Sequence, residues 1–213
     1  MNRLREYSTG YQLWCKPPAS EAGNHILYSK QHSAIQDRLS IRSLNLDTDL
    51  DIIHSWMNQS YAQRFWQLTG STEVVAAIYK GILKNLHAHT FIALVGEKPV
   101  ALIDLYATLT DELADHIKVT DGCGMHLLMC PPREMQKGWS LAVLKSFQEF
   151  YFGFPESQWL FAEPDVQNIP ANNLALKAGF TLLRTIQLSY KTANLYAIHR
   201  NDFIKSSESK TVL

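Results

Sequence analysis

The chain lacks most features that would place it outside a reducing compartment or in a membrane. Its 213 residues include only three cysteines, Cys15, Cys123 and Cys130, with no CxxC pair. An odd number without paired spacing argues against a disulfide framework and a zinc site. No run of residues approaches the roughly 18 apolar residues needed to span a bilayer, and the opening MNRLREYSTG lacks the apolar stretch of a signal peptide. We therefore expect a cytoplasmic protein with no membrane partner.

An excess of charge is also lacking, because 20 Lys and Arg balance 20 Asp and Glu. A neutral chain is not built around a broad cationic surface, so nucleic acid is a poor candidate for the main partner. Internal repeats and low-complexity stretches are absent as well. The apolar residues, in contrast, make up 46% of the chain and include five Trp. This content is sufficient for one large α/β domain with a stable core.

The order of the expected elements predicts the fold class. Residues 1–38 read as an N-terminal arm with one or two short strands, 39–205 as the domain, and 206–213 as a flexible polar tail. Within the domain we expect strands at 39–44, 90–96, 99–107, 124–130, 158–164, 180–188 and 194–200, and helices at 47–58, 72–86, 140–152 and 168–178. Antiparallel hairpins come first, followed by strand–helix–strand–helix–strand. The chain is therefore predicted to form an α+β mixed sheet flanked by helices, with a short parallel part, rather than a doubly wound sheet.

A strand–loop–helix segment at 124–152 has the features of a phosphate site. The loop holds Arg133, Lys137 and Gly138, and the helix begins at Ser140. Free backbone N–H groups at a helix start, with the helix dipole behind them, bind phosphate. Gly138 allows the backbone to approach a ligand closely. The same pattern is also compatible with an ordinary strand–helix connection.

A second segment, AEPDVQNIPANNLALKAGF at 162–180, ends a strand at Asp165, caps a helix at Asn168 and stops it at Gly179. Together the two segments resemble the GNAT superfamily, whose acetyl-CoA site has this order of elements. The usual pyrophosphate loop, Gln/Arg-x-x-Gly-x-Gly/Ala, reads MQKGWS at 135–140 here and departs from it at the first and last positions. The resemblance implies an acyl-CoA co-substrate and a CoA site made by Leu128, Met129, Arg133, Lys137, Gly138, Trp139, Ser140, Asn168 and Asn173.

Six further motifs narrow the resemblance to the siderophore acyltransferase branch. They are DIIHSWMN (51–58), FWQLTG (65–70), LIDLY (102–106), GMHLLMCPP (124–132), EPDVQN (163–168) and SYKTANLYAIHRNDF (189–203). The branch includes N6-hydroxylysine acetyltransferase and the N-hydroxyputrescine and N-hydroxycadaverine succinyltransferases. The resemblance covers about residues 39–203. It implies acylation of the hydroxylamine of such a small-molecule diamine to a hydroxamate, with succinyl-CoA as the preferred donor and acetyl-CoA as the alternative.

The resemblance also implies two catalytic residues. His126 and Asp165 match the positions of the family's catalytic His and Asp, His126 as general base and Asp165 as the group that orients it or the substrate nitrogen. A His with a pKa near the usual value of about 6.5 suits proton uptake at neutral pH. Without the resemblance, His126 is also compatible with a core histidine, and Asp165 with a residue that starts a helix.

Five residues are candidates for the acceptor site. Asp104 and Tyr106 share one face of a strand, so they could hold a distal ammonium by charge and cation–π contact, or face water. His54, Trp56 and Trp66 fall in the helical region expected to cover the acceptor, as pocket wall or as core. His87 and His89 form an HxH pair without a third ligand, so no metal is predicted.

Several alternatives stay open from the sequence. The same branch includes aminoglycoside 6′-N-acetyltransferases, and a non-catalytic acyl-CoA-binding scaffold module is an alternative of another class. A polycationic aminoglycoside would need a strongly acidic cleft, which this neutral chain does not suggest. The diamine, the acyl group and the basic residue for a succinyl carboxylate are undecided, as are a homodimer and docking to a downstream synthetase.

Overall fold

The computed structural model describes residues 13–18, 23–32, 35, 37–66, 68–119 and 122–208. Parts of the expected arm and most of the expected tail lie outside these ranges. The arm contributes one strand, β1 (Ile26–Gln31), to the fold. At the other end, α6 (Arg200–Glu208) continues into the first residues of the segment expected to be a tail.

One mixed sheet forms the centre of the described part of the chain. Its strands stand in the order β1-β2-β3-β4-β5-β6-β8-β7. Neighbouring strands are antiparallel except for β5 and β6, which run parallel. After β1 the strands are β2 (Arg38–Ser43), β3 (Ala88–Val95), β4 (Lys98–Ala107), β5 (Gly122–Met129), β6 (Trp159–Ala162), β7 (Thr181–Gln187) and β8 (Thr192–His199). The predicted α+β mixed sheet with a short parallel part is confirmed.

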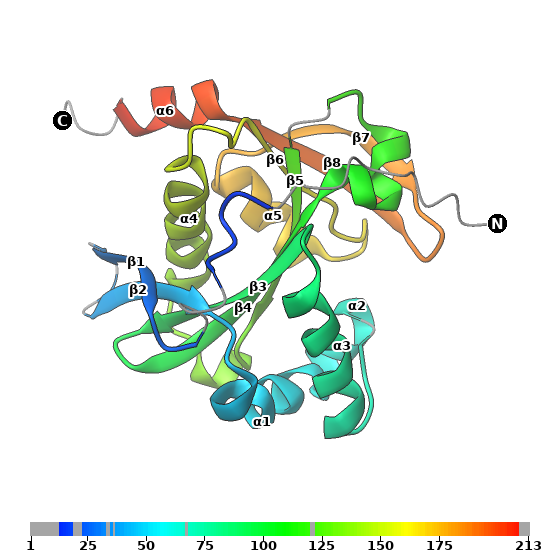
Figure 1. The fold of residues 1–213 in the computed structure, drawn as a ribbon. Coiled ribbons are helices and arrows are strands. Elements are labelled where there is room, and N and C mark those ends of the chain that lie inside the picture. The colour runs from blue at the N-terminus through cyan, green and yellow to red at the C-terminus, as the bar shows by residue number, and fades with distance from the viewer. Residues whose placement is uncertain are drawn as a thin grey trace.

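Helices cover both faces of this sheet. They are α1 (Leu46–Met57), α2 (Ser60–Trp66), α3 (Thr72–Lys84), α4 (Trp139–Phe152), α5 (Ile169–Lys177) and α6. Figure 1 shows α1, α2 and α3 gathered on one side of strands β3–β5, with α4 on the opposite side. The sequence patterns did not predict α2 or α6. Such short helices, seven and nine residues long, offer too few turns for apolar periodicity to identify them.

A buried ion pair ties the start of α1 to β2. The Arg42 guanidinium donates to both Asp49 carboxylate oxygens, at 2.6 and 2.7 Å. Asp49 also accepts the backbone N–H of Asn45 at 2.9 Å, and its side chain is 3% exposed. A negative charge in the first turn suits the helix dipole. The Arg42–Asp49 ion pair therefore fixes the first turn of α1 against β2.

Strand register brings three polar side chains into one row. The predicted tight turn after β3 is present, with Gly96 at φ +61°, a conformation that favours glycine. It sets β3 against β4 so that Thr90 lies opposite Asp104, and β5 places His126 opposite Asp104 on the other side. Directly opposed residues project from the same face of a sheet. Thr90, Asp104 and His126 therefore share one face.

The other face is closed by α4, which buries most of its length. Phe147 and Phe150 of α4 pack against Phe91 of β3, with ring centroids 5.7 and 5.4 Å apart. This packing fixes the C-terminal half of α4 against the sheet. Within the described ranges, no helix is both long and apolar enough to cross a membrane.

Candidate active site

The parallel strands β5 and β6 separate near the middle of the sheet. Their pairing runs from Gly122 to Gly124 of β5 and ends opposite Phe161 of β6, whereas β5 continues to Met129. The side of β5 turned away from β4 therefore has no described strand partner over residues 125–129. A cavity of about 950 Å³ opens here, a size typical of sites for small ligands and cofactors.

The walls of this cavity come from widely separated parts of the chain. They include α2, α3, β5, the start of α4, the segment after β6, α5 and the turn between β7 and β8. The wall is mainly apolar. Its carboxylates belong to Asp104, Glu163 and Asp165, and its Lys and Arg side chains are those of Arg64 and Lys191.

His126 lines this cavity. Its Nε2 lies 2.6 Å from Oε1 of Glu163. The His126 side chain is 38% exposed, whereas that of Glu163 is only 2% exposed. The rings of Trp66 and Tyr106 lie 6.1 and 5.1 Å from the imidazole, centroid to centroid. His126 is thus fixed from the protein side and open to the cavity.

The charges around His126 raise its pKa above the ordinary value. Burial by itself would lower the pKa, but the charge and hydrogen bond of Glu163, together with the charge of Asp104, outweigh burial. The pKa of Glu163 is lowered overall: burial would raise it, and the charge and hydrogen bond of His126 with the charge of Lys191 reverse that effect. Glu163 is therefore ionised at neutral pH. An ionised carboxylate only accepts hydrogen bonds, so Nε2–H is the donor.

Lys191, which the sequence analysis did not single out, also faces Glu163. Its Nζ lies 3.7 Å from Glu163 Oε1, the oxygen that His126 contacts, and its side chain is 10% exposed. The same ammonium lies 5.2 Å from the ring centroid of Tyr190, and both residues line the cavity. The turn between β7 and β8 thus brings a cation to the His126–Glu163 pair.

Asp165 lines the cavity, but its described bonds belong to the turn before α5. Its Oδ1 accepts the backbone N–H of Gln167 at 2.7 Å, and its carbonyl accepts from the side chain of Asn172 at 2.9 Å. The carboxylate that contacts His126 is instead that of Glu163, two residues earlier. Strand alternation could not choose between them, because β6 ends at Ala162 and both positions have the same parity.

Asp104 and Tyr106 both face His126. Asp104 accepts a hydrogen bond from Thr90 Oγ1 at 2.7 Å and from the Tyr79 hydroxyl at 3.4 Å. Burial raises the pKa of Asp104, although the hydrogen bond from Thr90 and the charge of His126 partly oppose the shift. Among the described residues, no Lys or Arg forms an ion pair with it.

The structure separates the three helical candidates for the acceptor wall. Trp66 of α2 lines the cavity, whereas His54 and Trp56 of α1 do not. The Trp56 side chain lies in the core, 2% exposed. His54 Nε2 lies 2.9 Å from the Gly70 carbonyl oxygen. His54 and Trp56 therefore contact other parts of the fold rather than the cavity.

The HxH pair lies away from the cavity. His89 is buried and its Nε2 lies 2.9 Å from the Ser43 hydroxyl. Burial and the charge of Lys16 lower the His89 pKa to about 3. Within the part of the chain that the structure describes, no group of three or more metal-ligating side chains occurs.

The loop before α4 has the backbone geometry of a phosphate site. Gly138 stands at the N-cap with φ +92°, and no side chain caps the helix. Ser140, in the first turn, lines the cavity together with Leu128, Met129 and Asn168. The open start of a 14-residue helix therefore points its free N–H groups and dipole toward this region.

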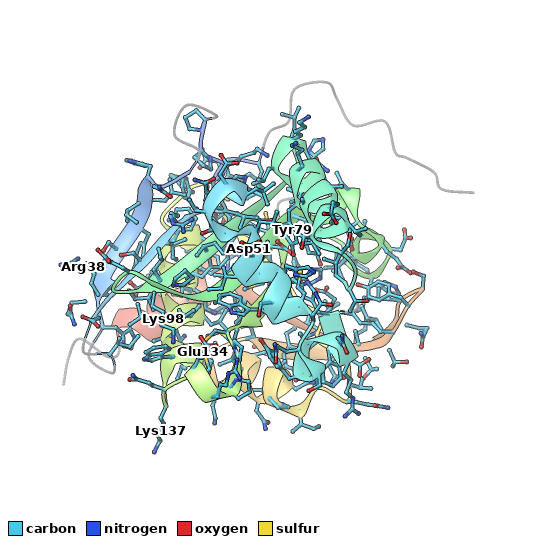
Figure 2. The ribbon with its side chains drawn as sticks, turned by 90° about the horizontal axis from the view of Figure 1, so that it is seen from below. Arg38, Asp51, Tyr79, Lys98, Glu134 and Lys137 are labelled. Atoms are coloured by element: carbon cyan, nitrogen blue, oxygen red, sulfur yellow. The ribbon has the colours of Figure 1, made fainter. Side chains whose placement is uncertain are left out.

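The remaining candidates for CoA contacts lie elsewhere. Arg133 and Lys137 are exposed and do not line the cavity; Figure 2 shows the Lys137 side chain extending away from the fold. Trp139 is 6% exposed and belongs to the core. Asn173 is exposed, whereas its neighbour Asn172 bonds to the turn before α5.

The comparison with known families identifies the family of the chain. A model of the acetyltransferase (GNAT) domain matches residues 45–188. The chain belongs to the GNAT acetyltransferase family. It is an acyl-CoA N-acyltransferase, and acyl-CoA is its co-substrate, as the sequence analysis predicted.

Individual relatives of this GNAT enzyme are distant. An N-hydroxyputrescine acetyltransferase of Acinetobacter baumannii is 26% identical over 174 residues, which cover 81% of this chain and 83% of the relative. An N(6)-hydroxylysine O-acetyltransferase of Escherichia coli is 23% identical, covering 90% of this chain and 68% of the relative. The structure of an aminoglycoside acetyltransferase with coenzyme A and kanamycin matches with a TM-score of 0.73 at 20% identity, covering 79% of this chain and 99% of that one. At this identity the structural match shows the shared fold alone.

Proposed function

We propose that this enzyme acylates the hydroxylamine nitrogen of an N-hydroxylated diamine, N-hydroxyputrescine or N-hydroxycadaverine, and so forms a hydroxamate in siderophore biosynthesis. The observation that carries the proposal is the pairing of Asp104 with His126 on the cavity wall. It sets a carboxylate that can hold a distal ammonium beside a histidine that can take up the proton of the reacting nitrogen. The substrates in the names of the two relatives support this acceptor class.

In the proposed reaction the hydroxylamine nitrogen attacks the thioester carbonyl directly. An N-hydroxylamine is less basic than an alkyl amine, so it is largely uncharged at neutral pH. As the N–C bond forms, His126 accepts the proton from nitrogen; the C–S bond then breaks, and the CoA thiolate leaves and takes up a proton. A positioned base contributes roughly 10²–10⁴-fold. Asp165, also on the cavity wall, is proposed to orient the substrate nitrogen.

The acceptor's distal ammonium is proposed to bind Asp104. Two neutral hydroxyl groups already contact this carboxylate, but its negative charge is not neutralised by a described Lys or Arg. Trp66 lines the cavity nearby, and its ring can add cation–π attraction, whereas Tyr106 does not line the cavity and would act only through His126. His54 and Trp56, which do not line the cavity, would act on this subsite only by supporting α2 and α3.

The CoA moiety is proposed to lie between the open part of β5 and the start of α4. The backbone around Leu128 and Met129 would pair with the pantetheine amides, and the N–H groups from Gly138 to Ser140 would bind the pyrophosphate. Asn168 also lines the cavity. Arg133 and Lys137 have long exposed side chains that can add charge to the same phosphates. Because the Trp139 side chain lies in the core, only the backbone N–H of this residue would contact the pyrophosphate.

For the acyl group, succinyl-CoA remains our preferred donor and acetyl-CoA the alternative. A succinyl carboxylate needs a cation within the pocket, and Arg64 and Lys191 line this one. The Arg64 guanidinium donates to the side-chain oxygen of Gln167 at 3.0 Å and is otherwise near the surface. Either cation could donate hydrogen bonds to the succinyl carboxylate. An acetyl group has no carboxylate and would pair with neither side chain.

The test is a thiol-release assay with the purified protein. It crosses acetyl-, succinyl- and decanoyl-CoA against N-hydroxyputrescine, N-hydroxycadaverine, N6-hydroxylysine and kanamycin, with product masses measured. We expect CoA release and a hydroxamate with one of the first two acceptors. His126→Ala should lower kcat by about 10²–10⁴-fold, while His25→Ala, at an exposed position, should match the wild type.

Other outcomes would overturn the proposal in distinct ways. Turnover of kanamycin alone would make the enzyme an aminoglycoside acetyltransferase, and N6-hydroxylysine alone would make it an enzyme of the hydroxylysine type. Silence across all combinations, in protein shown to bind CoA, would favour a scaffold module. Full turnover by His126→Ala would contradict the role of His126 as base.

A further inference from the structure

The contact between His126 and Glu163 distinguishes the two nitrogens of the imidazole. Nε2 is bonded to Glu163 at 2.6 Å. Nδ1 has no hydrogen bond to a described residue, and it is not fully buried. Nδ1 is therefore the nitrogen that the cavity can reach. A neutral imidazole carries its single proton on one nitrogen and a lone pair on the other.

We propose that Glu163 is a positioning residue for His126: its carboxylate holds the proton on Nε2, so that Nδ1 is the nitrogen that accepts the proton during acyl transfer. The catalytic half of this inference rests on the proposed role of His126 as the base. In that step the hydroxylamine N–H bond breaks, a new N–H bond forms at Nδ1, and the imidazolium is stabilised by the Glu163 carboxylate. The bond from Nε2 to Glu163 stays in place throughout.

Burial makes Glu163 suited to this task. Its side chain is 2% exposed, so water does not compete for the oxygen that faces Nε2. Competition comes instead from Lys191, whose Nζ lies 3.7 Å from the same oxygen. Glu163 and Lys191 therefore act on His126 in opposite directions: the carboxylate favours the imidazolium, and the ammonium disfavours it.

Charged and titratable groups from several elements act on His126. From β4 come Asp104, which also favours the imidazolium, and Tyr106. Burial raises the pKa of Asp111, in the segment after β4, and the charge of His126 partly opposes this rise. Glu163 follows β6, and Lys191 lies in the turn before β8. Exchanging only Glu163 or only Lys191 leaves the remaining charges unchanged.

The kinetic test uses two substitutions with opposite expected signs. In Glu163→Gln, the acid limb of the kcat/KM profile should move to lower pH, and kcat should fall by up to about 10²-fold, since the base as a whole contributes roughly 10²–10⁴-fold. In Lys191→Met, the acid limb should move to higher pH. Glu97→Gln, at an exposed turn position, should keep the wild-type profile. If the role of Glu163 were purely structural, Glu163→Gln would lower kcat/KM at every pH without moving the acid limb of the profile.

A second test needs no substrate. In ¹⁵N-histidine-labelled protein, His126 is identified among the eight histidines as the resonance missing from His126→Ala. Above its pKa, His126 should show a protonated Nε2 and an unprotonated Nδ1. A protonated Nδ1, or a His126 titration that is the same in Glu163→Gln as in the wild type, would overturn the inference. Because this readout is independent of turnover, a silent enzyme with the expected tautomer would refute the proposed function and leave the positioning by Glu163 intact.

Discussion

Gly124 of β5 and Tyr106 of β4 lie opposite each other in the sheet with no room for a side chain at position 124. A Cβ atom there would lie 2.2 Å from Cζ of Tyr106. Tyr106 in turn lies 5.1 Å from the His126 ring. The absence of a side chain at Gly124 therefore leaves room for the Tyr106 ring beside His126.

Gly124→Ala is expected to destabilise the fold and displace Tyr106. Overpacking of this kind costs about 1–3 kcal/mol, measurable as a lower midpoint in urea unfolding, and turnover should fall with it. Gly81→Ala is the matched control, because a Cβ at this exposed position in α3 meets nothing within 4 Å. There the change should stabilise the protein by roughly 0.5–1 kcal/mol. Equal stability of the two variants would contradict the close packing.

Asp104→Asn should weaken acceptor binding selectively. The amide keeps the volume and can still accept from Thr90, but it loses the charge that we propose pairs with the distal ammonium. We expect the KM of the diamine to rise about 10- to 100-fold, equivalent to about 1.4–2.8 kcal/mol, with little change in the KM of acyl-CoA. Asp51→Asn, at an exposed position on α1, should leave both constants unchanged. A rise confined to the KM of acyl-CoA would place Asp104 in the donor site instead.

The wild-type pH profile should reflect the raised pKa of His126. The base is active only when deprotonated, so kcat/KM should fall as the pH drops through the His126 pKa. Because Glu163 and Asp104 together outweigh burial, the midpoint should lie above the ordinary value of 6.5. Removal of the negative charge in Asp104→Asn should shift the midpoint downward. A wild-type midpoint below 6.5, measured with an acceptor that does not titrate in this range, would contradict the described charge balance.

The three thiols should be silent toward a thiol reagent in the native protein. Cys15, Cys123 and Cys130 are all free and buried. Burial raises the pKa of Cys123 to about 12 and that of Cys130 to about 11, and the thiolate is the reactive form. A DTNB titration should therefore detect almost no thiol before unfolding and three after it. Rapid reaction of one native thiol would contradict the burial and add a background to the CoA-release assay.

Local sequence signals were sufficient for most of the fold. Two apolar runs and the turn at Gly96 predicted the β3–β4 hairpin, and Asn168 and Gly179 bracketed the helix that became α5. Such signals are short-range, so they can be read without knowing what the element packs against. The helices α2 and α6 escaped prediction because most of what stabilises short helices comes from packing.

The sequence by itself also determined the family, through the ordered motifs, and the candidates His126, Asp104 and Tyr106, since alternate residues of a strand share a face. It could not decide which aromatic residue lines the cavity: Trp56 and Trp66 both lie in helices, and only the packing of α1 and α2 buries the first and exposes the second to the site. Nor could it choose Glu163 over Asp165 as the contact of His126. That contact spans 37 residues and depends on where β5 and β6 separate, and Lys191 reaches the same oxygen from the turn before β8. Contacts of this kind depend on how distant strands pair, which only the tertiary structure decides.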